Sequence, residues 1–431
     1  MKIQNVKGGY DFLPNEQKVR DYISETITKN FKLYGFNSIE TPILCYYDIL
    51  SDKYDENSDI LNEIYRLKDQ GLRDLGLRYD LTVPFAKFIF LNKNKISLPF
   101  KRYEISKVFR DGPVKVGRDR EFTQCDADIV GIEGEFIEAE LLTLFIKTFK
   151  DLDIEINIKY NNLKLMKGLI KDSGIEEEKI PSVIAIIDKK EKVSENEFEE
   201  MLTSIGIDIE KIKRLNNNFS KDLKTLNKER DNINLKEGIE ELENLTNYIK
   251  ELGIDNICKI DLTLARGQNY YTGSVFEVYD KKKRITGSIA AGGRYDNMIT
   301  DFINDGNKYP AAGISFGLTG IYEILKNEKS INETPNSNFY IIPMNTKIES
   351  LKVANELRDL SYNVEVELTN KKLKKCLEYA DKNKIKYVIV IGSNEIEKNQ
   401  ITIKNMFNKK SIDINLDNLI NIKEFLNKID Y

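Results

Sequence analysis

The stretch from residue 98 to residue 130 reads LPFKRYEISKVFRDGPVKVGRDREFTQCDADIV. Two segments in it, 98–110 and 120–130, have the composition of β-strands, and the segment between them is rich in turn-forming residues. We therefore predict a β-hairpin with a long loop. Residues 101–120 hold seven basic and three acidic side chains, although the whole chain has a net charge of -4. The hairpin is thus a local basic region in an acidic protein.

The hairpin brings several chemically useful side chains within reach of one another. Arg110 closes the first strand, and Arg118 and Arg120 open the second, so their guanidinium groups can converge on one cavity and bind a polyphosphate there. The period of two along a strand places an aromatic ring, an amide and two carboxylates on one face of the returning strand: Phe122, Gln124, Asp126 and Asp128. The alternative interpretation is an ordinary solvated loop, which is what most charge clusters are.

Helical and extended segments surround this hairpin. Apolar spacing predicts helices at 16–33 and 133–149 and β-strands at 38–42 and 154–160. Residues 164–256 are dominated by Lys, Glu, Asn and Ile with helical spacing, which indicates a helical insertion.

Strand and glycine signals return after the insertion, at 260–279 and 288–297. A polar stretch at 330–338 then resembles a linker. Beyond it, predicted strands alternate with predicted helices, as in a small α/β domain: strands at 339–344, 363–368 and 387–391, and helices at 348–360 and 371–383.

Chain length also favours several domains, because 431 residues exceed what one core of roughly 150 residues accommodates. We predict a first domain from residues 1–163 and 257–328, an insertion at 164–256, and a C-terminal domain at 337–431.

Composition excludes several functional classes. The chain has no histidine, which rules out Ser-His-Asp triads, imidazole bases and histidine-bound metals. Its four cysteines lie far apart, so we expect free thiols in a reducing cytoplasm rather than a zinc or dithiol site. We find neither a signal peptide nor an apolar run long enough for a membrane span.

Two glycine-rich segments also have a composition suited to binding. Residues 264–277 read LARGQNYYTGSVFE, which we interpret as a β-strand interrupted at Arg266-Gly267 and at Thr272-Gly273. Residues 290–296 read AAGGRYD, whose paired glycines allow a ligand to approach the backbone closely. Bulged strands with buried tyrosines are the alternative, although they do not explain the arginines.

Taken together, these segments resemble class II aminoacyl-tRNA synthetases of the histidyl-tRNA synthetase family. Residues 35–42 resemble the dimer-forming motif 1, and residues 109–128 resemble motif 2 in its histidyl form. Residues 266–273 and 292–296 resemble the two signatures that distinguish this family from other class II enzymes. The similarity extends over nearly the whole chain, and its motifs occur in the family's order.

The resemblance implies an α+β class II catalytic core, in which helices accompany a six-stranded antiparallel sheet, together with a helical insertion and a C-terminal α/β anticodon-binding domain. It also implies a reaction in which histidine and ATP form histidyl-adenylate and pyrophosphate, and the histidyl group then passes to tRNA(His). ATP would bring Mg2+ with it. We expect a cytoplasmic homodimer formed through motif 1, with no membrane partner.

The resemblance implies roles for residues around ATP. Arg110 would contact the α-phosphate and the carboxylate of histidine, Arg118 the outer phosphates, and Phe122 the adenine ring. Arg266 would be the second α-phosphate ligand, so that Arg110 and Arg266 are the catalytic pair. No residue is assigned to a metal ion.

Further roles concern histidine and tRNA. Asp80, Thr82 and Gln124 would bind the ammonium group of histidine, although Asp80 also suits the cap of a helix that begins near Thr82. Asp128 and Tyr271 would bind the imidazole, and Arg266 and Tyr270 would complete this pocket. The predicted tRNA contacts are basic: Lys115, Arg120, Lys371, Lys372, Lys374 and Lys375.

Three positions depart from the family pattern: Asp80 and Asp128 stand where the family usually has the longer glutamate, and the third departure is the serious one. Motif 3 of class II enzymes ends in an arginine for the γ-phosphate of ATP, and this chain has Gly320 there. Two other functions therefore remain open: a histidine-binding regulatory paralogue, and an RNA-binding sensor without catalysis. The regulatory paralogues generally lack the C-terminal domain and have a degraded Arg-Gly-x-x-Tyr-Tyr signature, whereas this chain has both. Gly320 is the feature that favours the sensor.

Overall fold

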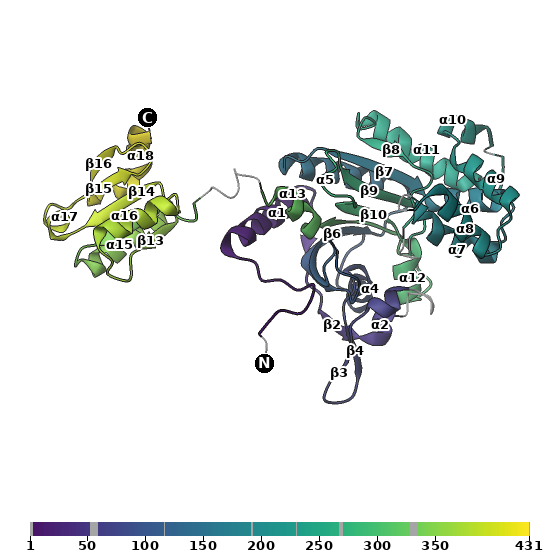
Figure 1. Cartoon of the computed structure of the whole chain (residues 1–431), viewed down its shortest axis with the longest axis horizontal. Helices are drawn as coiled ribbons and strands as arrows, with labels where there is room; N and C mark the ends of the chain where they lie inside the picture. Colours follow the sequence, from purple (N-terminus) through teal and green to yellow (C-terminus); the bar gives the residue numbers. More distant parts are fainter. Residues whose placement is uncertain are drawn as a thin grey trace. The chain divides into compact units, whose positions relative to one another are not determined.

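A computed structural model describes residues 3–51, 59–115, 117–190, 193–229, 231–266, 270–327 and 335–430 of the chain (Figure 1). By its internal contacts the chain divides into two units, 1–327 and 328–431. Each unit has its own sheet, so we describe them separately.

An eight-stranded sheet forms the centre of the first unit, in the order β1-β5-β6-β11-β10-β9-β7-β8. The six inner strands are antiparallel, as the family resemblance implies, and the two edge strands β1 and β8 add parallel pairs. The strands are β1 (Asn37–Ser38), β5 (Phe100–Phe109), β6 (Glu121–Val130), β7 (Ile156–Asn162), β8 (Cys258–Ile260), β9 (Ser274–Asp280), β10 (Ala290–Arg294) and β11 (Ala311–Gly317).

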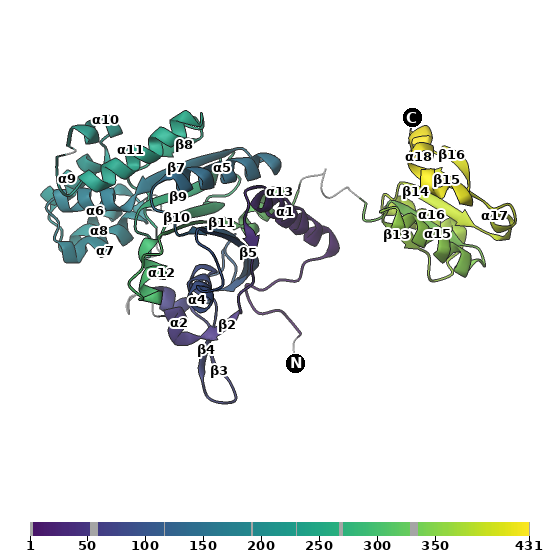
Figure 2. The ribbon, with the colours of Figure 1, turned by 180° about the vertical axis from the view of Figure 1, so that it is seen from behind.

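One face of this sheet is covered by long helices (Figure 2): α1 (Pro14–Leu33), α5 (Phe136–Asp151), α11 (Lys236–Glu251) and α13 (Leu318–Leu325). In α1 the apolar residues recur every four positions, from Val19 to Phe31, so they form one buried stripe. Phe31 meets Phe316 of β11 edge to face, with 5.8 Å between ring centroids. The predicted helices at 16–33 and 133–149 are therefore confirmed to within three residues at either end.

The β5–β6 hairpin is confirmed and is fully paired over ten residues of each strand. Its register puts Arg102 opposite Asp128 and Val108 opposite Phe122. In the loop between the strands, Lys115 and Arg118 form an antiparallel bridge. The predicted strand at 38–42 is shorter and shifted, because β1 is Asn37–Ser38 and only Ser38 of the predicted range pairs with β5.

The prediction of one interrupted strand over 264–277 is wrong, since β9 begins only at Ser274. The side-chain amide of Asn161 donates hydrogen bonds to the backbone oxygens of Leu262 (2.9 Å) and Leu264 (3.0 Å). These carbonyl groups are therefore engaged by a side chain instead of a strand neighbour. Arg266 follows in a loop, and residues 267–269 of the quoted signature lie outside the described residues.

Helices alone occupy the described part of the insertion, which lies beside β7 and β8 at one end of the sheet (Figure 1). They are α6 (Leu163–Asp172), η1 (Glu177–Lys179), α7 (Ile180–Ile187), α8 (Glu195–Ser204), α9 (Ile209–Phe219), α10 (Leu223–Leu226), η3 (Asn227–Glu229) and α11. The switch from strand β7 to helix α6 occurs at Asn162, whose side chain accepts hydrogen bonds from the backbone N–H groups of Lys164 and Leu165.

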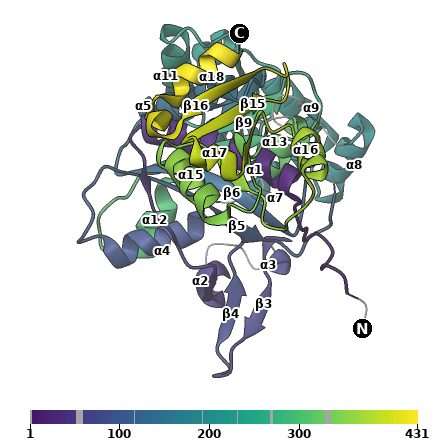
Figure 3. The same ribbon diagram turned by 90° about the vertical axis from the view of Figure 1, so that its left-hand side faces the viewer.

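Further elements lie on the other side of the large sheet. A small sheet in the order β2-β4-β3 projects from the unit (Figure 3) and was not predicted from the sequence. Its strands and the neighbouring helices are β2 (Leu44–Tyr46), α2 (Tyr47–Ser51), α3 (Asp59–Glu63), β3 (Arg66–Lys68), β4 (Asp74–Leu77), α4 (Thr82–Asn92) and α12 (Asp296–Ile303).

The second unit contains a five-stranded sheet in the order β13-β12-β14-β15-β16. Its elements are β12 (Phe339–Pro343), α15 (Lys347–Asp359), β13 (Val364–Val366), α16 (Leu373–Lys382), β14 (Tyr387–Ile391), α17 (Ser393–Glu397), β15 (Gln400–Asn405), β16 (Ser411–Asn415), η4 (Leu416–Asn421) and α18 (Ile422–Asp430). The three predicted strands and two predicted helices are confirmed, whereas the antiparallel pair β15–β16 was missed.

Candidate active site

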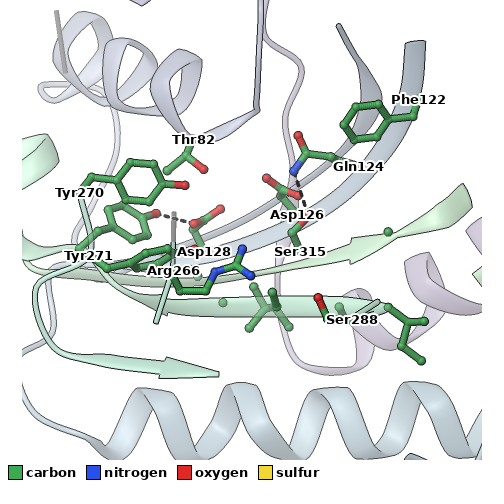
Figure 4. Close-up of a pocket in the computed structure, with 18 of the residues that line it drawn as sticks. Thr82, Phe122, Gln124, Asp126, Asp128, Arg266, Tyr270, Tyr271, Ser288 and Ser315 are labelled. Atoms are coloured by element: carbon green, nitrogen blue, oxygen red, sulfur yellow. Dashed lines mark hydrogen bonds between the residues drawn. The ribbon is translucent and has the colours of Figure 1, made fainter. Parts of the chain in front are cut away.

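A cavity of about 210 Å³ opens on the face of the large sheet that α1 does not cover. On the covered face, Thr123 accepts a hydrogen bond from Arg20 of α1. Alternation along β6 therefore turns the neighbouring side chains toward the cavity. Phe122, Gln124, Asp126 and Asp128 all line it, as the sequence predicted. Figure 4 shows Phe122 and Gln124 toward one end and the two aspartates toward the middle.

The two polar residues nearest the centre of β6 share one partner on β11. The side-chain amide of Gln124 donates a 3.1 Å hydrogen bond to the hydroxyl of Ser315, which lies in register with Asp126 (Figure 4). Asp126 is buried, and its Oδ1 has no hydrogen-bond partner among the described residues. Burial raises the pKa of Asp126 to about 8, against the opposing effect of Arg102. A carboxyl group that is largely protonated near neutral pH therefore lies at the cavity wall.

Asp128 is fixed by two partners at the base of the cavity. Arg102, its cross-strand neighbour, places Nη2 2.6 Å from Asp128 Oδ2, and the hydroxyl of Tyr295 donates a short hydrogen bond to Oδ1. All three residues are buried. Burial raises the pKa of Asp128, while Arg102 and Tyr295 act in the opposite direction.

Glycine at position 313 is required by this arrangement. Gly313 faces Asp128 across the β6–β11 pair, and a Cβ atom there would lie 1.9 Å from Asp128 Oδ1. Any side chain would therefore displace the carboxylate.

Arg110 lies at the opposite end of the cavity, between two aromatic rings. Its guanidinium carbon is 4.2 Å from the ring centroid of Tyr79 and 4.9 Å from that of Phe122. Its Nε donates a 3.2 Å hydrogen bond to the backbone oxygen of Tyr79. Arg110 also lines the cavity, where its guanidinium can meet an anion.

The segment from Arg78 to Thr82 is anchored against β5. Arg78 is fully buried, with Nη1 2.9 Å from Glu104 Oε1 and 2.8 Å from the backbone oxygen of Thr41. Asp80 Oδ1 accepts hydrogen bonds from the backbone N–H groups of Thr82 (3.1 Å) and Val83 (3.0 Å), at the start of α4. The structure thus gives Asp80 the capping position considered above, whereas Thr82 lines the cavity.

Arg266 enters the cavity from the loop before β9. Its Nη1 forms a short ion pair with Glu277, and its guanidinium carbon lies 6.0 Å from the ring centroid of Tyr271. Burial alone would lower the pKa of Arg266, but Tyr271, Glu277 and Tyr270 together raise it, so the group stays charged. Tyr270 and Tyr271 line the same side of the cavity as Arg266 (Figure 4).

The cavity thus brings together two arginines, the aromatic ring of Phe122 and a group of buried polar side chains. A sequence profile described as histidyl-tRNA synthetase matches residues 8–321. The chain is also 43% identical to histidine–tRNA ligase 1 of Bacillus cereus, over 98% of this chain and 100% of that relative. The chain belongs to the histidyl-tRNA synthetase family.

Other comparisons cover the second unit and the fold. A profile described as an anticodon binding domain matches residues 338–424. The solved histidyl-tRNA synthetase of Nostoc sp. PCC 7120 is 29% identical, with a TM-score of 0.83 and coverage of 98% of this chain and 99% of that one. A Bacillus halodurans structure described as an ATP phosphoribosyltransferase regulatory subunit/histidyl-tRNA synthetase is 22% identical, with a TM-score of 0.75 and coverage of 90% and 97%. At that identity the likeness concerns the fold alone.

Eight of the residues that the synthetase resemblance singled out line this one cavity: Thr82, Arg110, Phe122, Gln124, Asp128, Arg266, Tyr270 and Tyr271. Sequence reasoning missed the supports beneath them, namely Arg102, Glu277, Tyr295 and Ser315. Tyr295 lies within the quoted AAGGRYD segment, so a signal for it existed. Arg102 had none, because its role follows from a cross-strand register that no local pattern specifies.

Three basic residues of the first unit that the synthetase resemblance implicated do not line the cavity. Arg118 places Nη2 3.0 Å from Glu63 Oε1. Arg120 places Nη2 3.0 Å from Asp111 Oδ1, and its Nε donates a 3.2 Å hydrogen bond to the backbone oxygen of Gly112. Lys115 lines a separate cavity next to Arg20.

Gly320 lies in the first turn of α13. A Cβ atom there would meet the side chains of Ile285 at 3.4 Å and Ile289 at 3.7 Å, which is ordinary van der Waals contact. The backbone therefore does not require glycine, and Ile289 lines the cavity beside it.

Two findings concern membranes and metals. Within the described part of the chain, every helix is too short or too polar to cross a bilayer. Among the same residues, no three Cys, Asp or Glu side chains come together in a way that could hold a metal ion.

Proposed function

We propose that this chain is a histidine–tRNA ligase that activates histidine with ATP and transfers the histidyl group to tRNA(His). The observation that supports it best is the convergence of Arg110, Arg266 and the buried polar residues of β6 on one cavity. A carboxylate oxygen of histidine attacks the α-phosphorus of ATP, and the bond from that phosphorus to pyrophosphate breaks. The chain orients the two substrates and supplies positive charge to the reacting phosphate. Neither activation nor transfer needs a histidine side chain of the protein.

The arginine end of the cavity binds ATP in this proposal. Phe122 stacks on adenine, and Arg110 contacts the α-phosphate and the carboxylate of histidine through the donors that Tyr79 leaves free. Arg266 approaches the same phosphate from the other side of the cavity. Arg118 reaches the outer phosphates only after leaving Glu63. Mg2+ enters with ATP, bound to its phosphate oxygens.

The buried end of the cavity binds histidine. Thr82 and Gln124 accept from the ammonium group, and Asp80 contributes its negative charge from behind the start of α4. Asp128 and Tyr271 bind the imidazole, with Arg266 and Tyr270 closing the pocket. A carboxylate oxygen has two lone pairs, so Asp128 can accept an imidazole N–H while it keeps Tyr295 and Arg102.

The second unit binds the anticodon arm in this proposal. Lys371, Lys372, Lys374 and Lys375 are exposed at the start of α16, whose first turn has no acidic residue. Cations are unfavourable at the positive end of a helix, so a phosphate partner would relieve that repulsion. Lys115 and Arg120 are proposed tRNA contacts in the first unit.

The dimer expected from motif 1 is also part of the proposal. Several apolar side chains near residues 35–42 are exposed in the single chain: Leu33, Ile43, Leu44 and Tyr46. A second copy of the chain covering them would remove this apolar surface from water.

Histidine-dependent exchange of pyrophosphate into ATP tests the proposal. We expect exchange with histidine and not with other amino acids, and loss of exchange by at least about a hundredfold in Arg266→Ala, the size typical for a group that stabilises transition-state charge. A folded, tRNA-binding protein without exchange at saturating ATP and Mg2+ would instead identify the non-catalytic sensor. A protein that binds histidine but neither catalyses exchange nor binds tRNA would be the regulatory protein.

A further inference from the structure

We propose that Glu277 is a positioning residue for Arg266, and that Tyr279 in turn holds Glu277. The inference rests on the proposed role of Arg266 and deepens it. It concerns two residues of β9 that do not belong to the signatures discussed above.

Both oxygens of the Glu277 carboxylate are engaged. Oε1 forms the short ion pair with Nη1 of Arg266, and Oε2 accepts a short hydrogen bond from the hydroxyl of Tyr279. Glu277 and Tyr279 are two residues apart on β9, so they lie on the same face of the strand. The Glu277 side chain is 14% exposed and that of Arg266 20% exposed, so water weakens this pair little.

Arg266 depends on this contact because its backbone belongs to a loop. The loop is tied to β7 through Asn161, which binds Leu262 and Leu264 but not Arg266 itself. Within the described residues Glu277 is the carboxylate that pairs with Arg266, and Nε of Arg266 has no hydrogen-bond partner there. The direction of the guanidinium is therefore set from the side of Glu277.

The cation that lies opposite Glu277 on β7 forms an ion pair with another carboxylate. Lys159 lies opposite Glu277 in the β7–β9 register, but its Nζ is 2.9 Å from Asp261 Oδ2. Glu277 and Tyr279 also line a second cavity of about 440 Å³, which shares Ser288 with the first. Glu277 thus borders the second cavity, while its partner Arg266 lines the first. If it no longer holds Arg266, the guanidinium has room to move.

The expected effect falls on the reaction step. Arg266 is proposed to stabilise charge that develops at the α-phosphate, so a misdirected guanidinium costs transition-state stabilisation more than substrate binding. A displacement near 1 Å in such a group can cost a rate factor of about 100. Loss of Glu277 should therefore lower kcat and leave KM nearly unchanged.

The test measures histidine-dependent ATP–pyrophosphate exchange in the full-length protein. We expect Glu277→Gln to lower kcat about tenfold or more, with KM for ATP and for histidine within about threefold. Tyr279→Phe should act in the same direction but less strongly, because it removes only the support of the carboxylate. The matched control is Asp280→Asn, which breaks another ion pair of β9, that of Asp280 with Arg284 at 2.8 Å, outside the cavity. It should change thermal stability but not kcat.

A double variant separates positioning from general damage. If Glu277 acts through Arg266, Arg266→Ala with Glu277→Gln is no slower than Arg266→Ala alone, because the two effects are not additive. Additive losses, or a Glu277→Gln enzyme with wild-type kcat, would overturn the proposal. If Arg266→Ala itself retains full exchange, the role proposed for Arg266 fails instead. That outcome differs visibly from failure of Glu277 alone.

Discussion

At the scale of single residues, the carboxylates of β6 differ in what holds them. Asp128 Oδ2 lies 2.6 Å from Nη2 of the buried Arg102, whereas burial raises the pKa of Asp126 to about 8. Asp128 therefore has a supporting role in addition to its proposed contact with histidine, whereas Asp126 is largely protonated near neutral pH. Residue types alone did not separate these roles.

The first prediction concerns Asp128→Ala. From the sequence alone this substitution should abolish histidine activation with little loss of stability, but the buried pair changes the second expectation. Removing the carboxylate takes the nearest counter-charge from the buried Arg102 and leaves Glu104 at 4.0 Å, and breaking a buried pair in this way typically costs about 3–5 kcal/mol. Urea unfolding of wild type and variant measures this loss of unfolding free energy. Adding Arg102→Leu should recover most of the stability but not the activity, and a loss below about 1 kcal/mol would contradict this account.

The second prediction concerns pH and Asp126. Its pKa of about 8 in the folded protein exceeds the ordinary value of 3.8, so the folded state binds more protons than the unfolded state between these values. Stability therefore falls as pH rises through this window. In Asp126→Asn that contribution is absent. From pH 4 to pH 8, the unfolding free energy of the wild type should fall relative to that of the variant. A difference between the two proteins that does not change with pH would argue that Asp126 ionises normally.

The third prediction concerns Gly320. Arg110 and Arg266, the proposed α-phosphate ligands, both line the cavity, so losing a γ-phosphate contact should weaken ATP binding more than the chemical step. We expect exchange with a high KM for ATP. Gly320→Arg should lower that KM, because the Cβ position is in ordinary contact only. Gly320→Ala, which adds no charge, is the control. An unchanged KM in Gly320→Arg would show that the triphosphate does not pass this helix end.

At the scale of elements, the hairpin β5–β6 and the helix α16 were both predicted from the sequence, but for different reasons. The hairpin combines strand composition with a turn-rich loop. Helix α16 has apolar spacing, and the segment around it, residues 371–386, holds seven lysines. In both, local periodicity was enough to place the side chains on faces.

The fourth prediction concerns α16. Replacing Lys371, Lys372, Lys374 and Lys375 by glutamine should weaken tRNA binding and reduce its dependence on salt, by about 0.7 per lost phosphate contact in the logarithmic slope. Exchange without tRNA should be unaffected. The control replaces four lysines on other exposed surfaces of the same unit: Lys347, Lys352, Lys423 and Lys428. Equal losses in both variants would indicate nonspecific attraction to the unit as a whole.

At the scale of the whole molecule, the chain forms two units with separate sheets and separate cores. In the second unit, the core on one side of the sheet includes Phe339, Ile389 and Ile403. The cavity lies entirely within the first unit. Activation and anticodon binding should therefore be separable.

The fifth prediction concerns truncation. A protein of residues 1–327 should keep histidine-dependent exchange within about threefold, because every residue that lines the cavity belongs to this unit. It should lose most tRNA charging. Exchange and charging assays on the same preparation test this, with circular dichroism as the control for folding. Loss of exchange in a folded 1–327 protein would show that the second unit contributes to activation.

The sequence by itself determined which segments line the cavity. The alternation of β6 put Phe122, Gln124, Asp126 and Asp128 on one face, and Arg110 and Arg266 both line the cavity that this face forms. Such patterns are local, because a strand repeats every two residues whatever surrounds it.

The tertiary structure alone decided what holds these groups. The register of β5 against β6 placed Arg102 opposite Asp128, and β9 brought Glu277 to Arg266 from beyond the signature. It also placed the Asp80 carboxylate at the start of α4, a position that the sequence offered only as an alternative. Register and packing depend on contacts between segments far apart in the chain, and no periodicity within one segment encodes them.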